Sequence, residues 1–151
     1  MIKLRTAATL LLPLAVSCSQ HNAPRPAEAS APAAEEAAVR AVIERYLHGL
    51  KFNDVPSLQA SFWPEAKLFW VKRDGTLGQL TQAQWYAGFA ASAGKEEEGD
   101  LRMTSLEVTD DIAAAKITEV YPKDIYVDYV TLARIGGQWR IVAKVYTRSL
   151  R

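Results

Sequence analysis

Residues 128–147 read DYVTLARIGGQWRIVAKVYT and hold two apolar runs on either side of Gly136 and Gly137. Paired glycines between alternating apolar runs are typical of a two-residue β-hairpin turn, because the favoured turns need positive φ at their central positions. The stretch therefore predicts two antiparallel strands. It begins with a carboxylate, Asp128, and the register of the hairpin decides where that carboxylate lies.

Regular pairing, counted outward from the turn, places Asp128 opposite Val145 and on the apolar face of the hairpin. That face would carry Asp128, Val130, Leu132, Arg134, Trp139, Ile141, Ala143 and Val145. The other face would carry Tyr129, Thr131, Ala133, Gln138, Arg140, Lys144 and Tyr146. We therefore expect Lys144 and Asp128 on opposite faces, without an ion pair between them.

A carboxylate on a core face is costly unless it is paired, hydrogen-bonded or open to a wet cavity, and desolvation raises its pKa. Three interpretations of Asp128 stay open: a rim residue in water or bonded to a backbone N–H, a ligand contact, or a general acid or base. The opposite face is either solvated or self-associating, since aromatic residues and Arg are enriched at interfaces. A homodimer face would use Tyr129, Arg140, Lys144 and Tyr146.

The rest of the chain predicts helices first and strands afterwards. Apolar residues recur at every third and fourth position of residues 35–50, which indicates an amphipathic helix. Further helices are expected at residues 53–62 and at 81–94, the latter opening with a capping box of Thr81 and Gln84 and stopping at Gly94. Two short strands are expected within 67–80, joined by a turn at Asp74-Gly75. Four more are expected at 100–110, 111–122, 124–135 and 138–148. This order favours an α+β fold with helices packed on a curved antiparallel sheet.

The first 17 residues have the parts of an export signal: a basic start, a short apolar stretch and small residues before Cys18. The apolar stretch is shorter than the about 20 residues that a membrane-spanning helix needs. The residues LAVSC resemble the lipobox of bacterial lipoproteins, which implies lipidation at Cys18, and ordinary cleavage after Ser17 is the alternative. We expect an outer-membrane lipoprotein facing the periplasm, or else a soluble periplasmic or secreted protein.

Residues 18–34 are rich in Ala and Pro and predict a tether that follows the lipid-anchor cysteine, so the folded domain is expected at 35–151. The formal net charge is +1, and removing Lys3 and Arg5 with the signal makes it −1. A nearly neutral domain argues against nucleic acid as a partner. Without a metal-ligand cluster or a glycine-rich phosphate loop, we expect no metal and no cofactor.

The order of elements and the run DYVTLARIGGQWRIVAKV resemble the putative lumazine-binding family of the nuclear transport factor 2-like superfamily, over roughly residues 36–147. The family pattern is Asp-Tyr, an apolar strand, a glycine turn, then Trp, a basic residue, Ile-Val and Lys. Two positions depart from it: Trp63 stands where histidine is frequent, and Ala143 where asparagine is frequent. The resemblance implies a cone-shaped fold with a cavity between sheet and helices and, by the family name, a pteridine-like ligand. The expected lining is Tyr46, Trp63, Trp70, Trp85 and Asp128.

Three functions follow from these patterns. The first is a binding domain for a small, flat, largely apolar molecule, tethered to the cell envelope. The second is a structural homodimer module in the envelope. The third is an isomerase or dehydratase with Asp128 as general acid or base; because His21 and His48 lie away from it, no catalytic dyad is expected.

Overall fold

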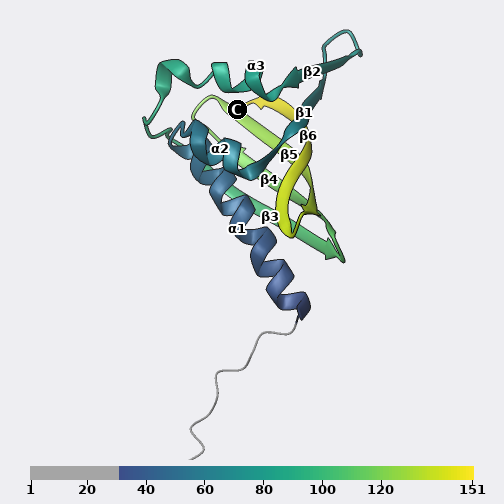
Figure 1. The fold of residues 1–151 in the computed structure, drawn as a ribbon. Coiled ribbons are helices and arrows are strands. Elements are labelled where there is room, and N and C mark those ends of the chain that lie inside the picture. Colours follow the sequence, from purple (N-terminus) through teal and green to yellow (C-terminus); the bar gives the residue numbers. More distant parts are fainter. Residues whose placement is uncertain (1–30) are drawn as a thin grey trace, which may run out of the picture.

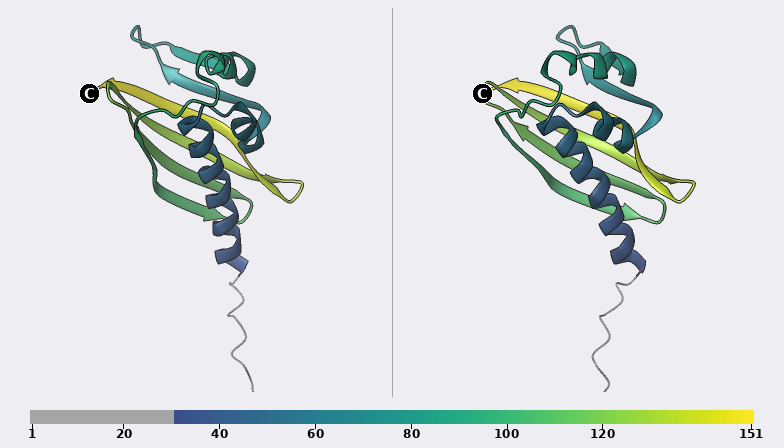
Figure 2. Two further views of the ribbon diagram at one scale, coloured as in Figure 1. Left: turned by 90° about the vertical axis from the view of Figure 1, so that its left-hand side faces the viewer. Right: turned by 60° about the vertical axis from the view of Figure 1, so that its left-hand side comes forward.

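The computed structural model describes residues 31–151 and confirms the α+β fold: two helices come first, a curved sheet of six strands follows, and a further short helix lies between its second and third strands in the chain. Figures 1 and 2 show α1 lying across one face of the sheet, and the outline narrows toward the start of that helix. The predicted signal peptide, Cys18, His21 and most of the tether lie outside the described residues.

The helices are α1 (Ala31–Lys51), α2 (Val55–Ser61), α3 (Gln82–Ala87) and the 3₁₀ turn η1 (Ala90–Ser92). Helix α1 begins four residues before the expected start. The capping box at the start of α3 is confirmed, because the Thr81 and Gln84 side chains each bond the other residue's backbone N–H. The expected end of this helix at Gly94 is wrong: α3 ends before Gly88, a residue type that disfavours the helix interior.

The strands are β1 (Phe62–Val71), β2 (Leu77–Thr81), β3 (Asp100–Thr109), β4 (Ile112–Val120), β5 (Asp124–Ile135) and β6 (Gln138–Leu150). They form one sheet in the order β2-β1-β6-β5-β4-β3. The pairing of β1 with β6 is parallel and the others are antiparallel, so the sheet is mixed.

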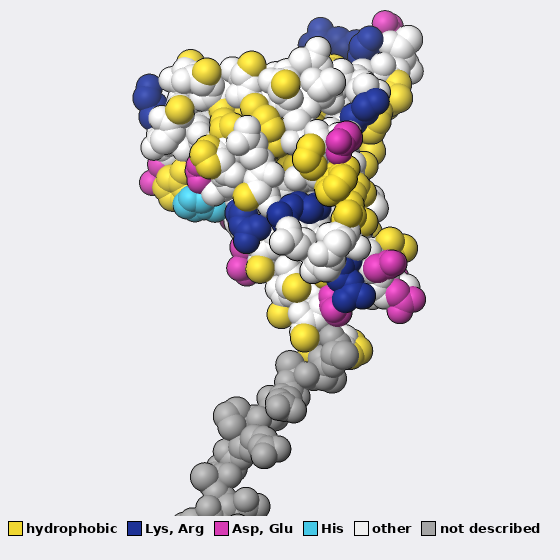
Figure 3. All heavy atoms as spheres, viewed as in Figure 1, with side chains coloured by type: hydrophobic (Ala, Val, Ile, Leu, Met, Phe, Trp, Pro, Cys, Tyr) yellow, Lys and Arg dark blue, Asp and Glu magenta, His cyan; other side chains and the backbone are white. Residues whose placement is uncertain are grey.

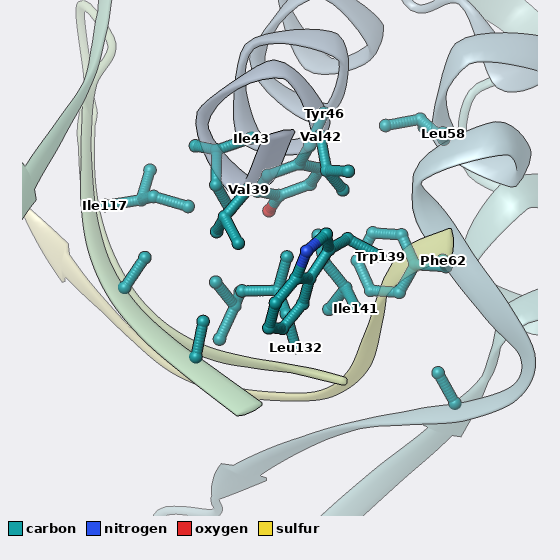
Figure 4. Packing of buried hydrophobic residues seen from close by; sticks show 14 of the residues in the cluster. Val39, Val42, Ile43, Tyr46, Leu58, Phe62, Ile117, Leu132, Trp139 and Ile141 are labelled. Atoms are coloured by element: carbon teal, nitrogen blue, oxygen red, sulfur yellow. The ribbon is translucent and has the colours of Figure 1, made fainter. Parts of the chain in front are cut away.

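The core lies between α1 and the concave face of the sheet. The apolar stripe of α1 packs on alternate residues of β4, β5 and β6, and Figure 4 shows Tyr46 among Ile117, Leu132 and Ile141. Each fully buried side chain of this size contributes about 1.5–3 kcal/mol by leaving water. This packing fixes Tyr46 against the inner face of the sheet.

The predicted register of the hairpin is correct only beside its turn. Leu132 pairs with Ile141, but Thr131 pairs with Ala143, so Val142 is an extra residue in β6. A β-bulge of this kind reverses the alternation of every side chain that follows it. Asp128 therefore lies opposite Tyr146 and not opposite Val145.

The bulge also overturns the predicted placement of Lys144. Lys144 pairs with Val130, points to the same face as Asp128, and is only 4% exposed, whereas Val145 is 49% exposed. The expected dimer face is therefore not one surface. Tyr129 is exposed on the outer face, whereas Lys144 and Tyr146 face the concave side.

Candidate functional site

Four polar side chains meet where α1 crosses the sheet: Tyr46 from α1, Glu119 from β4, Asp128 from β5 and Lys144 from β6. Each strand contributes an inward-facing position, and each of the four residues is less than 5% exposed. They form the buried polar cluster. Such a group is stable inside a protein only when its charges and hydrogen bonds are satisfied.

Lys144 is held from several sides. Its Nζ lies 2.5 Å from Asp128 Oδ2 and donates a hydrogen bond to the Tyr46 hydroxyl at 2.7 Å. The Tyr46 hydroxyl in turn donates to the same Asp128 oxygen at 2.5 Å. The ammonium also lies 5.1–5.4 Å from the ring centroids of Tyr46, Trp85 and Tyr146, within cation–π range. The charge of Lys144 is therefore compensated without water.

Glu119 is the fourth member and has weaker contacts. Its Oε1 lies 3.9 Å from Lys144 Nζ and 3.5 Å from the Tyr46 hydroxyl, and its Oε2 accepts a hydrogen bond from Tyr121 at 3.1 Å. The pKa of Glu119 is raised to about 8, and burial is the largest cause. The Lys144 charge lowers this pKa by a smaller amount, and the Asp128 charge raises it. Glu119 is thus mostly a neutral carboxylic acid at neutral pH.

Burial and the nearby carboxylates act on the tyrosines in the same direction. Burial and then the Asp128 charge raise the pKa of Tyr46 well above its ordinary value, and burial and then Glu119 raise that of Tyr121. Both hydroxyls therefore keep their protons over the physiological range and act as hydrogen-bond donors.

A pocket of about 540 Å³ lies beside the buried polar cluster, near the end of α1. Glu119 and Lys144 supply polar groups to it, and aromatic side chains supply much of its wall: Trp85, Phe89, Tyr121, Tyr126 and Tyr146. Its volume lies within the roughly 300–1,000 Å³ of small-molecule sites. Aromatic walls with a few converging polar groups are typical of sites for flat, mostly apolar ligands.

The rim of this pocket is fixed by hydrogen bonds to the 94–99 loop. Lys51 Nζ donates to the carbonyls of Glu97 and Gly99 at 2.6 and 3.1 Å, and Asn53 donates to the Glu97 carboxylate at 2.9 Å. The charge run at 95–98 predicts only a solvated loop, but Glu97 and Asn53 both line the pocket. The loop is therefore part of the site.

A family profile described as "Putative lumazine-binding" matches residues 34–147 of the chain. The chain belongs to this family. The resemblance predicted from the hairpin residues is thereby confirmed, with nearly the same boundaries. No curated protein is similar enough to match.

Solved structures share the fold of this lumazine-binding-family domain. An NTF2-like protein of unknown function from Silicibacter pomeroyi DSS-3 is 25% identical, with a TM-score of 0.68 over 81% of this chain and 100% of that one. Another from Shewanella baltica OS155 is 20% identical, with a TM-score of 0.71 over 81% and 98%. A "putative ketosteroid isomerase" from Shewanella frigidimarina NCIMB 400 is 12% identical, with a TM-score of 0.55 over 73% and 94%. The last two show the fold alone.

The five predicted lining residues of this family member fall in different places. Trp85 lines the pocket, whereas Tyr46 and Asp128 lie in the buried polar cluster beside it. Trp70 packs on Tyr146 from the side, with ring centroids 5.8 Å apart, and Trp63 is 37% exposed away from the pocket. Asp128 is fully buried, so its interpretation as a solvated rim residue is wrong.

Sequence reasoning missed Glu119, although a signal for it exists. Ala113, Ala115, Ile117 and Glu119 alternate along β4, and the first three form an apolar set that points to the core. Extending that alternation by one step places Glu119 inside.

Among residues 31–151, no group of three or more His, Cys, Asp or Glu side chains is placed to hold a metal ion.

Proposed function

We propose that this chain is an exported, envelope-tethered domain that binds a small planar molecule in the pocket beside the buried polar cluster. The observation that carries the proposal is the pairing of aromatic walls with a polar inner end formed by Glu119 and Lys144. Aromatic side chains favour a flat ring system, and the polar pair fixes which edge of it faces inward. The family description suggests a pteridine-like compound.

The cluster itself supports binding better than catalysis by Asp128. One Asp128 oxygen is engaged by both Tyr46 and Lys144, and the carboxylate is fully buried, so a substrate has no route to it. A general acid or base must reach the proton that it transfers. Glu119, which does line the pocket and titrates near neutral pH, is the residue that an isomerase or dehydratase would use instead.

Self-association through the outer face of the sheet is a second proposal. Ile112, Tyr129 and Val145 are each about half exposed there, and Tyr129 pairs directly with Val145. Exposed apolar side chains that lie together are typical of interaction surfaces. A homodimer would therefore use Tyr129, Ile112 and Val145 in place of Lys144 and Tyr146.

Two tyrosines of β5 give a matched test of both proposals by native mass spectrometry of the full-length chain. Tyr126 lines the pocket, and Tyr129 points to the outer face. We expect a small retained mass in the wild type and in Tyr129→Ala that is lost in Tyr126→Ala, and a dimer that is weakened only by Tyr129→Ala. A retained mass that survives Tyr126→Ala would contradict binding in this pocket.

Export and tethering rest on the residues LAVSC and on the Ala- and Pro-rich segment after them. No helix within residues 31–151 is long and apolar enough to cross a membrane. Charged side chains of both signs are interspersed on the face in Figure 3, without a one-sign patch that would hold the domain on a lipid surface.

We expect Cys18→Ser to move the protein from the membrane to the soluble fraction of the cell envelope. An unchanged distribution would refute the lipid anchor.

A further inference from the structure

The buried polar cluster holds one cation and two carboxyl groups. The side chains of Lys144, Glu119 and Asp128 are each at most 5% exposed. Two ionised carboxylates beside one ammonium would leave a net negative charge in the core, which costs far more than keeping one carboxyl protonated. One proton must therefore reside on the two acids.

The hydrogen bonds indicate where that proton lies. Asp128 Oδ2 accepts from Tyr46 and contacts Lys144, whereas Asp128 Oδ1 is buried without a partner among residues 31–151. A buried carboxylate oxygen without a donor is destabilising. Glu119 lies within side-chain hydrogen-bonding reach of Asp128, and this contact raises the pKa of Glu119 further. A proton carried by Glu119 supplies the missing donor.

This arrangement determines what the pocket offers to a ligand. With its proton directed at Asp128, Glu119 presents acceptor oxygens, one of which accepts from Tyr121. Lys144 has three N–H donors and directs two of them at Asp128 and Tyr46. Its third N–H lies beside the Glu119 carboxyl group, whose Oε1 is 3.9 Å from Nζ.

The titratable groups that border Glu119 come from every surrounding element. They are Tyr46 from α1, Glu97 from the 94–99 loop, Tyr121 and Lys123 after β4, Asp124, Tyr126 and Asp128 from β5, and Lys144 and Tyr146 from β6. Asp124 is paired with Arg148 and Lys144 with Asp128, and Glu97 and Lys123 carry opposite charges. The inner end of the pocket is therefore close to neutral, and an anionic ligand end would face the Glu119 oxygens.

We propose that Glu119 and Asp128 share one proton, and that Glu119 and Lys144 together recognise the adjacent N–H and C=O of an uncharged lactam-type heterocycle. Glu119 accepts from the ligand N–H, and Lys144 donates to the neighbouring carbonyl. The proposal rests on the proposed function, because it names the ligand edge that the same pocket reads. It makes Glu119 the residue that determines specificity.

The test compares two pteridines in fluorescence titrations of the full-length chain near pH 6, below the pKa of Glu119. Lumazine carries the lactam N–H groups, and 1,3-dimethyllumazine has methyl groups in their place; both are uncharged there. We expect lumazine to bind roughly tenfold more tightly, since the methylated compound leaves a buried acceptor unpaired. Glu119→Gln should keep this preference, because its amide can donate to Asp128 and accept from the ligand. Glu119→Leu should abolish it.

The outcomes separate this proposal from the function on which it rests. Equal binding of the two pteridines to the wild type would overturn the proposal and leave the binding function intact, whether or not the Leu variant folds. Retention of the preference in Glu119→Leu would also overturn it. If neither compound binds the wild type, the pteridine-like ligand suggested for the pocket is wrong, and this inference fails with it.

Above about pH 8, the ligand can lose a proton as well as Glu119. The Glu119→Gln variant has no acid at this position, so it shows how much affinity is lost through the ligand alone. The wild type should lose affinity for lumazine more steeply than Glu119→Gln, because only the wild type gains a negative charge in the pocket. Parallel pH profiles of the two proteins would overturn the shared proton.

Discussion

At the scale of single residues, Lys144 shows how a cation is accommodated inside this core. Its ammonium has a carboxylate at 2.5 Å, a tyrosine hydroxyl at 2.7 Å and three aromatic rings around it. Burying such a pair brings little net stability, but removing one partner leaves an uncompensated charge. The cost of a substitution therefore depends on what remains behind.

Replacing Lys144 by Met should lower the free energy of unfolding by about 3–5 kcal/mol, because Asp128 is left buried without its cation. Urea denaturation measures the loss. Lys67→Met is the matched control on an exposed site and should change stability by less than about 0.5 kcal/mol. Adding Asp128→Asn to the Met variant should restore part of the stability. A loss below about 1 kcal/mol in Lys144→Met would contradict the buried ion pair.

Glu119 should make the stability of the folded domain depend on pH. Its pKa is raised from 4.5 to about 8 on folding, so the folded state binds more protons than the unfolded state between these values. The contribution is fully present below about pH 4.5 and is lost as the pH rises through 8. Urea midpoints across this range should fall less steeply for Glu119→Gln than for the wild type. Identical slopes would show that Glu119 is already ionised.

The sequence predicts these residues unequally. Asp128 is placed correctly on the core face because the residues next to it alternate regularly. Glu119 follows the same rule along β4 and was within reach of sequence reasoning. Lys144 was not, since one unpaired residue reverses its side and nothing in the composition of residues 141–143 marks a bulge. A lysine on an amphipathic strand is ordinarily solvated.

At the scale of elements, the bulge at Val142 allows β6 to serve two purposes. Before it, Trp139 and Ile141 fill the apolar core, and after it Lys144 and Tyr146 face the polar cluster and the pocket. If the strand instead alternated regularly through Val142, Val145 would turn inward and Lys144 outward. The bulge thus allows one strand to contribute apolar side chains to the core and polar side chains to the site.

Deleting Val142 should cost little, about 1 kcal/mol, because the residues on either side of it already pair with adjacent residues of β5 and Lys144 stays opposite Val130, beside Asp128. Val142→Ala keeps the residue count and should cost only about 1 kcal/mol at this half-buried position. Circular dichroism during urea unfolding compares the two. A deletion variant that loses the folded state would contradict the assignment of Val142 as the unpaired residue.

The elements themselves follow largely from local sequence signals. The stripe of α1, the capping box of α3 and the turn glycines each specify a backbone geometry without help from distant residues. The parallel pairing of β1 with β6 does not follow from such signals. It joins strands far apart in the chain, and no turn between them fixes the register.

At the scale of the whole molecule, α1 begins at the narrow end of the domain, and the pocket beside the buried polar cluster lies near the other end of that helix. Near the start of α1, Glu35 accepts hydrogen bonds from Arg134 and from the Trp139 indole, and Glu35 and Arg134 line a second pocket of about 700 Å³. The Ala- and Pro-rich segment precedes α1, so a tether would leave from this narrow end. The proposed anchor and the proposed ligand site would then lie at opposite ends of the domain.

The four tryptophans give the most direct test of binding in this pocket, because their indole N–H signals can be followed together by ¹⁵N NMR. Only Trp85 lines the pocket; Trp70 lies behind its wall, and Trp63 and Trp139 lie away from it. During titration with lumazine we predict a large saturable shift of the Trp85 indole, a smaller one for Trp70, and none for Trp63 or Trp139. Shifts confined to Trp63, or no shift at saturating ligand, would contradict a binding site in this pocket.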